Sequence, residues 1–387
     1  QYALKHARLS NGWKKWIGEN RGIQKLDGIE KKKDFEEGFE NWVTADAGRK
    51  QMYGGLLPAF DETYEELSDA QLEMIYLIEA GLGIEIVRAA RMADRLVDLS
   101  EKEETTEEEI QQQVDQLIRR GEDFYEDYYQ PIDRKAIVSL LEIYRENFPA
   151  DRLPGVFELI NDKYDGDIQA YADKVFKKSI FAGEEDFMDF FQKYKQRRYK
   201  KIKKDPAYEL AQSFINYYRE NTMPLISGLN VQIDSMMRIY MKAQMEYQPE
   251  KRFYPDANST LRVAYGKVKP YHPRDGVFYD YQTTLEGIME KEDPNIYDYV
   301  VEDKLKALYQ DKDYGKYGME EEMPVCFIAT NHTTGGNSGS PALNADGQLV
   351  GLNFDRCWEG TMSDLIFDPD QCRNIMLDVR YFLFIVD

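Results

Sequence analysis

The sequence is poor in positive charge and has no long apolar run, and both absences narrow what the protein can do. Its 387 residues include 50 Lys and Arg against 71 Asp and Glu, which gives a net charge of −21. This balance argues against nucleic-acid binding, which needs a basic surface, so the basic run 193–204 reads as a solvated helix face. No apolar run approaches the roughly 20 residues that are needed to span a bilayer.

The first residues also lack the pattern of a signal peptide. Segment 1–6 contains no Met and reads as a helix from the middle of a domain. We therefore expect the chain to begin inside a longer protein.

Cysteine is scarce, and the motifs by which cysteine and histidine bind metals are absent. The three cysteines are Cys326, Cys357 and Cys372. We expect buried free thiols, since an odd number of cysteines cannot all pair. The sequence has no CxxC pair, no HExxH motif and no phosphate-cradling loop. We therefore expect no metal and no nucleotide cofactor.

Helical patterns dominate the first 250 residues of a chain whose 42% hydrophobic content is enough for a packed core. Ser68–Gln71 and Thr106–Glu109 have the composition of capping boxes, and Asp133 stands where it could cap a further helix. Gly121 is expected to interrupt the helix that follows the second box. Residues 1–250 are therefore predicted to form an α-helical domain.

The composition changes at 247–255, and short runs with β character follow. Thr260–Tyr265 alternates between apolar and polar residues, Gly276–Tyr279 is similar, and two further strands flank a Gly-rich loop. Residues 251–387 are therefore predicted to form part of a β-barrel with insertions, so the whole chain has the α+β class.

The Gly-rich loop 333–341, Thr-Thr-Gly-Gly-Asn-Ser-Gly-Ser-Pro, lies between the strand-like runs Pro324–Ala329 and Gln348–Phe354. Trypsin-like serine proteases present their nucleophile on such a loop, because glycine lets backbone amides converge on one point. Ser338 is the candidate nucleophile, and the amides of Gly336 and Ser338 are candidate donors to an oxyanion. An ordinary Gly-rich hairpin loop is the alternative interpretation.

A serine nucleophile needs a base, and the three histidines of the chain are poor candidates. His332 lies six residues before Ser338 on the same loop approach, His272 lies in a Pro-flanked turn, and His6 lies in the first helical segment. The sequence therefore predicts a nucleophile that has no evident partner in this chain.

Arg356, at the end of the second strand, is a candidate for binding substrate. Arg356 lies 18 residues after Ser338, where the strand of a trypsin-like barrel lines the pocket for the residue before the cleaved bond (P1). A fixed guanidinium there pairs bidentately with a carboxylate, whereas the alternative is a surface arginine at a strand end. Asp355, the residue before Arg356, is from the sequence alone most simply a solvated acidic residue.

Short motifs in the last third of the chain form a specific combination. They are segments 256–262, 273–275, 279–284, 289–294, 330–341, 353–359, 371–374 and 378–381. This combination resembles the serine dipeptidyl-peptidase family that includes dipeptidyl-peptidases 7 and 11, and it most resembles the C-terminal portion of the Asp/Glu-specific type. The resemblance is dense from about residue 256 onwards and looser before it.

The resemblance implies a chymotrypsin-like double β-barrel, with the helical domain inserted between its parts as a cap. It also implies that Ser338 is the nucleophile, that Arg356 binds the carboxylate of a P1 Asp or Glu, and that Asp355 holds the substrate's amine. The dipeptidyl-peptidase 7 type carries Gly in place of this Arg. Asn11 is a second amine ligand by the same resemblance, although Lys15 stands where the family has a further Asn.

In that family the His and Asp of the catalytic triad come from a barrel segment upstream of the helical domain, which has no match in this chain. We therefore expect this chain to be inactive alone and to need that segment of the same protein. The whole protein is expected to release N-terminal dipeptides that end in Asp or Glu from peptides with a free N-terminus. The resemblance further implies a periplasmic homodimer. A dipeptidyl-peptidase for hydrophobic P1 residues and a non-catalytic peptide-binding fragment are the alternatives.

Overall fold

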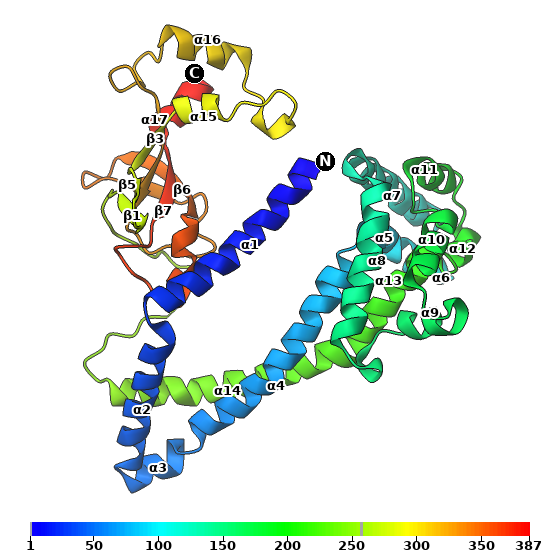
Figure 1. Cartoon of the computed structure of the whole chain (residues 1–387), viewed down its shortest axis with the longest axis horizontal. Helices are drawn as coiled ribbons and strands as arrows, with labels where there is room; N and C mark the ends of the chain where they lie inside the picture. Colours follow the sequence, from blue (N-terminus) through cyan, green and yellow to red (C-terminus); the bar gives the residue numbers. More distant parts are fainter. Residues whose placement is uncertain (1, 256–257) are drawn as a thin grey trace. The chain divides into compact units, whose positions relative to one another are not determined.

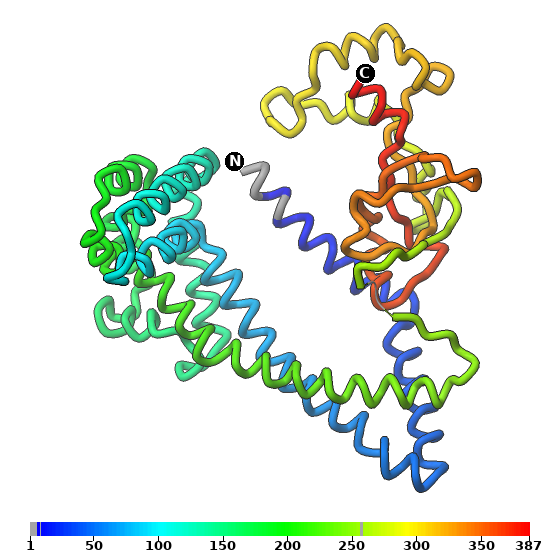
Figure 2. The backbone as a smooth tube through the Cα atoms, turned by 180° about the vertical axis from the view of Figure 1, so that it is seen from behind, coloured from blue at the N-terminus to red at the C-terminus, as the bar shows by residue number. Residues whose placement is uncertain are grey.

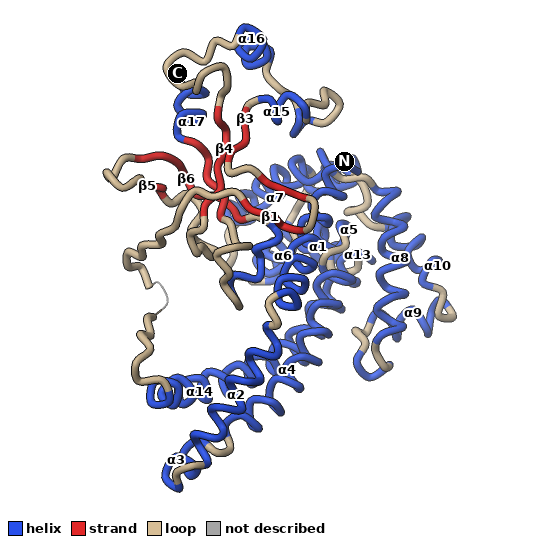
Figure 3. The backbone as a smooth tube through the Cα atoms, turned by 60° about the vertical axis from the view of Figure 1, so that its left-hand side comes forward, coloured by secondary structure: helices blue, strands red, loops and turns tan. Residues whose placement is uncertain are grey.

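The chain forms two compact units in the computed structural model, which describes residues 2–255 and 258–387. One unit is Asn41–Lys251, and the other combines Tyr2–Glu40 with Arg252–Asp387. Within the described residues every strand belongs to the second unit, as the red segments of Figure 3 show. A large helical region is thus followed by an antiparallel β-sheet region, which confirms the predicted α+β class.

The predicted domains, 1–250 and 251–387, divide the chain by its secondary structure and stay a prediction. The contacts of the structure group the start of the chain differently, because Tyr2–Glu40 packs with the second unit. Asp256 and Ala257, which belong to one of the motifs above, lie outside the described residues.

The described part of the first unit consists of helices, of which α4, α7 and α14 are the longest with 22, 21 and 25 residues. No helix among the described residues is both long and apolar enough to cross a membrane. In chain order the segments are the end of α2 (Gly28–Thr44), α3 (Ala47–Tyr53), α4 (Leu56–Leu77), η1 (Ile78–Leu82), α5 (Glu85–Arg91), α6 (Asp94–Glu101), α7 (Glu107–Asp127), α8 (Gln130–Asn147), η2 (Ala150–Arg152), α9 (Val156–Tyr164), α10 (Ile168–Lys178), α11 (Glu184–Gln192), η3 (Gln196–Arg198), α12 (Tyr199–Ile202), α13 (Pro206–Tyr217), η4 (Tyr218–Thr222) and α14 (Met223–Tyr247).

The long helices α4 and α14 lie side by side, as Figures 1 and 2 show from opposite directions. Buried residues recur on α4 at spacings of three and four, which is the period of one helix face. The ring of Phe60 on α4 meets that of Tyr240 on α14 edge to face, with 5.6 Å between centroids. One apolar face on each helix is therefore enough to join them.

The core of the first unit is rich in aromatic rings. Tyr144 is fully buried, and its ring centroid lies 5.5 Å from that of Phe157 and 5.9 Å from that of Phe214. Gly121 lies inside α7 and does not end it, so the predicted interruption is wrong. A side chain at Gly121 would meet the ring of Phe187 at 2.3 Å, so the glycine serves close packing.

The two predicted capping boxes have different outcomes. Thr106 caps α7: its Oγ1 accepts from the N–H of Glu109 at 3.2 Å, and the Glu109 carboxylate accepts from the N–H of Thr106 at 2.9 Å. Ser68, in contrast, lies in the middle of α4, whose buried face already begins at Leu56. The prediction at Ser68 is wrong because packing against α14 overrides the local preference.

Asp133 caps a helix, but not the helix that its own position predicts. It lies within α8 and is 2% exposed, and its carboxylate accepts from the N–H groups of Glu85 at 3.0 Å and Ile86 at 2.8 Å at the start of α5. Burial raises the pKa of this carboxyl from its ordinary value of 3.8 to about 6. Asp133 therefore joins two helices that are far apart in the sequence.

The second unit contains, among the described residues, a five-stranded antiparallel sheet of strand order β3-β4-β7-β6-β5 and a separate β1–β2 hairpin. The strands are β1 (Tyr271–Arg274), β2 (Val277–Tyr279), β3 (Gln282–Thr284), β4 (Pro324–Ala329), β5 (Pro341–Leu343), β6 (Leu349–Arg356) and β7 (Asn374–Asp378). The helices are α1 (Tyr2–Lys25), most of α2, α15 (Glu286–Glu290), η5 (Tyr297–Tyr299), α16 (Asp303–Asp311), η6 (Trp358–Asp364) and α17 (Val379–Val386).

The predicted strands of this unit are confirmed with one exception. β4, β6 and β2 cover the runs that alternation and apolar content predicted. Thr260–Tyr265 forms no strand, and the side chains of Leu261 and Tyr265 are 89% and 90% exposed. An alternating segment forms a strand only where a partner strand supplies hydrogen bonds. Within the described ranges Thr260–Tyr265 has no partner strand.

Helix α1 belongs to the second unit because it packs closely on η6. A side chain on Gly18 would approach the Trp358 carbonyl oxygen to 2.1 Å, and one on Gly22 would approach the Met362 side chain to 2.5 Å. Two glycines one turn apart therefore give α1 a flat strip on which η6 rests.

Arg373, which belongs to one of the motifs, holds together the turns beside the sheet. Its side chain is 1% exposed and donates to four backbone carbonyls at 2.7 to 3.0 Å. The carbonyls belong to Lys269, Pro270, Pro369 and Cys372. A charged group at this depth is stable only with its donors satisfied, so Arg373 fixes two chain segments against each other.

The buried Asp133 makes a prediction about stability and pH. At pH 4.5 the folded Asp133 is mostly a neutral acid, whose carbonyl and hydroxyl oxygens can both accept from the amides of α5, whereas the NH2 group of the Asp133→Asn variant can only donate. We therefore expect the variant's free energy of unfolding at this pH to be about 1–3 kcal/mol below that of the wild type. The folded-state pKa of about 6 lies above the unfolded value, so the folded protein binds more protons between pH 3.8 and 6. The contribution of Asp133 to stability is therefore fully present below pH 3.8 and declines as the pH rises to 6.

Urea unfolding at pH 4.5 and pH 7 measures this contribution, with the exposed Asp162→Asn on α9 as the matched control. The difference between wild type and Asp133→Asn should shrink at pH 7, while the control stays within about 0.5 kcal/mol of wild type at both pH values. A difference that grows from pH 4.5 to pH 7 contradicts the burial of this carboxyl.

Candidate active site

The loop that carries Ser338 joins β4 to β5 and turns at two glycines. Gly336 has φ +98° and Gly339 has φ +85°, which are left-handed conformations that residues with a side chain rarely adopt. The N–H of Thr334 donates to Asn337 Oδ1 at 2.9 Å, which closes the first turn. The positions of the glycines in the sequence therefore follow from the backbone that the loop needs.

Asn353 on β6 holds this loop against the sheet. Its carbonyl oxygen accepts from the Gly339 N–H at 2.7 Å, and its N–H donates to the Ser340 carbonyl at 2.9 Å. Its side chain is buried, donates to the Asn337 carbonyl at 3.2 Å, and accepts from Asn374 Nδ2 at 2.8 Å. Sequence reasoning missed Asn353, and its only signal is an amide side chain between the apolar residues of a strand.

Ser338 lies exposed between the two glycines. Its Oγ donates to the Phe354 carbonyl at 3.1 Å. In the part of the chain that the structure describes, the N–H groups of Gly336 and Ser338 have no acceptor. An accessible hydroxyl beside two free amides has the parts needed to attack a carbonyl and hold the resulting oxyanion.

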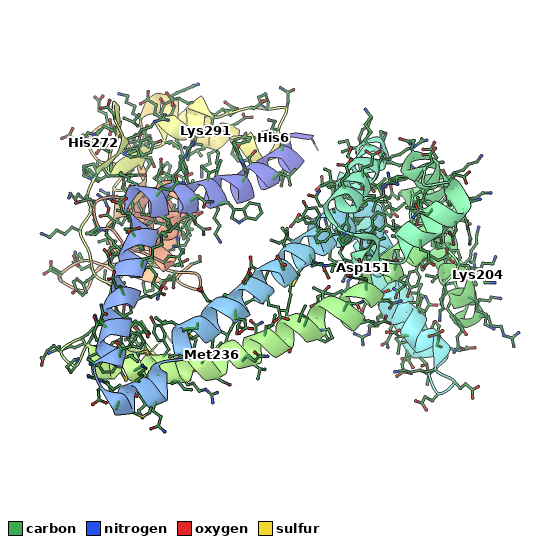
Figure 4. The ribbon with its side chains drawn as sticks, turned by 60° about the horizontal axis from the view of Figure 1, so that its bottom comes forward. His6, Asp151, Lys204, Met236, His272 and Lys291 are labelled. Atoms are coloured by element: carbon green, nitrogen blue, oxygen red, sulfur yellow. The ribbon has the colours of Figure 1, made fainter. Side chains whose placement is uncertain are left out.

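The three histidines make other contacts. His6 on α1, labelled in Figure 4, has its Nδ1 3.5 Å from Ser10 Oγ. His272 on β1, also labelled, places Nδ1 3.2 Å from the Val277 carbonyl oxygen. Over residues 2–255 and 258–387 no histidine is hydrogen-bonded to Ser338, and the base of this serine stays a prediction.

His332 connects the start of the serine loop to η6. Its ring stacks on Phe367 with 4.6 Å between centroids, and its Nε2 lies 3.0 Å from the Ser363 carbonyl oxygen. Because that oxygen can only accept, Nε2 carries the proton. His332 therefore fixes Ser363 in position.

Strand β6 contains one extra residue where it passes the loop. Asn353 and Asp355 stand opposite consecutive residues of β7, so Phe354 is the extra residue of a β-bulge. Because residues of a strand alternate between the two faces of a sheet, this residue returns Arg356 to the face that carries Asn353. The bulge thus brings Arg356 to the face of the sheet where Asn353 holds the serine loop.

The guanidinium of Arg356 already holds a carboxylate in the structure. Nη1 and Nη2 each lie 3.1 Å from one carboxylate oxygen of Asp364, and Nη1 also donates to Ser363 Oγ at 2.6 Å. The Arg356 side chain is 19% exposed. A planar fork fixed in this way is suited to recognise a carboxylate bidentately.

The two predicted amine ligands lie on different elements of the second unit. Asp355 is exposed, and its Oδ1 accepts from the N–H of Arg356 at 2.8 Å, which leaves its other oxygen for a ligand. Asn11 is exposed on α1, seven residues before the Gly18 contact and thus roughly 10 Å away along the helix axis. Their roles stay predictions.

A cavity of about 960 Å³ borders the same loop. Its walls include Thr333 and Ser340 of the loop, Asn353 of β6 and Met376 of β7. Ser338 and Arg356 do not line it. The candidate active-site atoms therefore lie beside this cavity and not in it.

The cysteines have surroundings that suppress reactivity. All three are free thiols, and burial raises the pKa of Cys326 and Cys372 and takes that of Cys357 to about 11. The described residues contain no group of three or more His, Cys, Asp or Glu side chains that could hold a metal ion. Ser338 therefore remains the candidate nucleophile of this unit.

Comparisons with known proteins fit these features. A family model described as Peptidase S46 matches residues 1–387. The chain is 42% identical over 388 residues to an Asp/Glu-specific dipeptidyl-peptidase of Flavobacterium psychrophilum, and 35% identical over 390 residues to a dipeptidyl-peptidase 7 of Porphyromonas gingivalis. Each alignment covers 100% of this chain and 53% of the relative.

A solved structure is similar over the same extent. The crystal structure of Porphyromonas endodontalis DPP11 in complex with substrate matches with a TM-score of 0.80 and 34% identity, covering 100% of this chain and 54% of that chain. This chain thus spans about half the length of the relatives that it matches.

Proposed function

The chain belongs to the peptidase S46 family, and we propose that the full-length protein is a serine-type dipeptidyl-peptidase selective for Asp or Glu at P1. Relatives of both the Asp/Glu-specific and the dipeptidyl-peptidase 7 type match the chain, so identity alone does not choose between them. The observation that favours acid selectivity is Arg356, which the bulge returns to the face of the sheet that carries Asn353, and whose guanidinium binds the carboxylate of Asp364 in the same chain bidentately.

Ser338 is the nucleophile in this proposal. Its Oγ bonds to the substrate carbonyl carbon while its proton passes to a base, and the carbonyl oxygen becomes an oxyanion. The N–H groups of Gly336 and Ser338 donate to that oxygen, a role supported by their lack of acceptors among the described residues. The carbon–nitrogen bond then breaks, the amine leaves with the base's proton, and water releases the dipeptide from Ser338.

The amine of the substrate sets the cleavage position. A dipeptidyl-peptidase has to hold the α-ammonium group at a fixed distance from the nucleophile, and carboxylates and amide oxygens are suitable ligands. Asp355 precedes the P1 ligand Arg356 directly, so one short stretch of β6 can hold the amine and the P1 side chain together. Asn11 is the second amine ligand of the proposal.

The base comes from a part of the protein outside this chain. This is supported by the contacts of His6, His272 and His332, which are all with groups other than Ser338. The relatives are about twice as long as this chain, which leaves room for a segment with the His and Asp of the triad. The family resemblance is the support for proposing that the complete protein is a periplasmic homodimer.

The role of Arg356 is tested by hydrolysis of a fluorogenic Leu-Asp amide and a Met-Leu amide by the full-length protein. We expect the wild type to prefer Leu-Asp, and the ratio of the two kcat/KM values to fall at least about thirtyfold in Arg356→Gly. Arg274→Gly, which removes an exposed arginine from β1, serves as the control and should leave the ratio unchanged. A wild type that prefers Met-Leu would instead support a hydrophobic-P1 enzyme.

Activity of the 387-residue chain alone tests whether the base for Ser338 comes from another part of the protein. We expect this chain to release no detectable fluorophore from the Leu-Asp amide, because no base reaches Ser338. Turnover by the isolated chain that disappears in its Ser338→Ala variant would show that the chain contains its own base.

A further inference from the structure

The fork of Arg356 that would receive a P1 carboxylate is occupied by a residue of the chain itself. Asp364, the last residue of η6, binds both Nη atoms at 3.1 Å through its two carboxylate oxygens. This is the bidentate geometry that a substrate Asp or Glu would adopt at the same guanidinium. Asp364 therefore stands in the place of the ligand.

The two sides of this pair are held with unequal strength. Ser363 accepts from Arg356 Nη1 at 2.6 Å and is 5% exposed, and its carbonyl oxygen is held in turn by His332. The Arg356 side chain is 19% exposed, whereas that of Asp364 is 48% exposed. The guanidinium is thus fixed by its buried neighbour, while the carboxylate of Asp364 can rotate into water.

A second carboxylate at the same guanidinium has an electrostatic cost. Either the substrate displaces Asp364 from the Nη fork, or it binds the remaining edge of the guanidinium and lies close to a like charge. In both arrangements Asp364 lowers the affinity of the site for an acidic P1 residue. A neutral P1 residue, in contrast, leaves the Arg356–Asp364 pair intact, so that the guanidinium keeps its partner.

We propose that Asp364 is a specificity-determining residue that competes with the P1 carboxylate for Arg356 and thereby lowers the preference for acidic over neutral P1 residues. This inference rests on the proposed function of Arg356. Competition differs from a positioning role. If Asp364 oriented Arg356, loss of Asp364 would weaken the binding of substrates with an acidic P1 residue.

The test is Asp364→Asn in the full-length protein, with the Leu-Asp and Met-Leu amides as probes. For Leu-Asp we expect KM to fall about two- to fivefold with kcat unchanged, because a competitor for ground-state binding is removed. KM for Met-Leu should not fall, so the selectivity ratio rises by the same factor. Asp370→Asn is the matched control, since it removes an equal charge from a side chain that is 83% exposed and pairs with Lys269, and it should leave the ratio unchanged.

A double variant separates this inference from the proposed function. In an Arg356→Gly background, Asp364→Asn should leave the ratio unchanged, because the two residues act on one interaction. A wild type that prefers acidic P1 through Arg356, but whose Asp364→Asn variant binds Leu-Asp equally or more weakly, overturns the inference and leaves the function standing. A ratio that does not depend on Arg356 overturns both. Asp364→Ser replaces Asp364→Asn if thermal unfolding shows that the Asn variant is not folded.

Discussion

The register of β6 on β7 is the constraint on which the candidate site depends. One extra residue, Phe354, shifts the register of β6 on β7, so that Asn353 and Arg356 lie on the same face of the sheet. Before the bulge, Asn353 holds the serine loop by backbone and side chain, and the bulged residue itself accepts from Ser338 Oγ. After it, Asp355 and Arg356 follow at once. A shift of one residue would turn Arg356 to the opposite face.

A second set of contacts keeps the pocket side of the site in place. η6 follows β6 directly and carries Ser363 and Asp364, and α1 lies against it through Gly18 and Gly22. A helix from the start of the chain therefore supports the turn that holds Arg356. This explains why residues 2–40 group by contact with the β-sheet unit and not with the helices that follow them in sequence.

Features fixed by neighbouring residues could be predicted from the sequence, and features fixed across the fold could not. The serine loop and the Thr106 cap depend on residues a few positions apart, and two of the three loop glycines, Gly336 and Gly339, have the positive φ that the loop requires. Asp133 caps a helix that begins 48 residues earlier, and the bulge at Phe354 depends on pairing with β7. Asp364 has no local signal, because only folding of η6 brings it to Arg356.

Acid selectivity in the proposed function depends on the binding of a P1 carboxylate by the Arg356 guanidinium. Calorimetric binding of the dipeptides Leu-Asp and Leu-Asn to the full-length Ser338→Ala protein tests it most directly, because the two ligands have nearly the same shape and differ in one charge. We expect Leu-Asp to bind about tenfold more tightly or better, and the difference to vanish when Arg356 is also replaced by Gly. Equal affinities for the two dipeptides in the protein that retains Arg356 would contradict the claim.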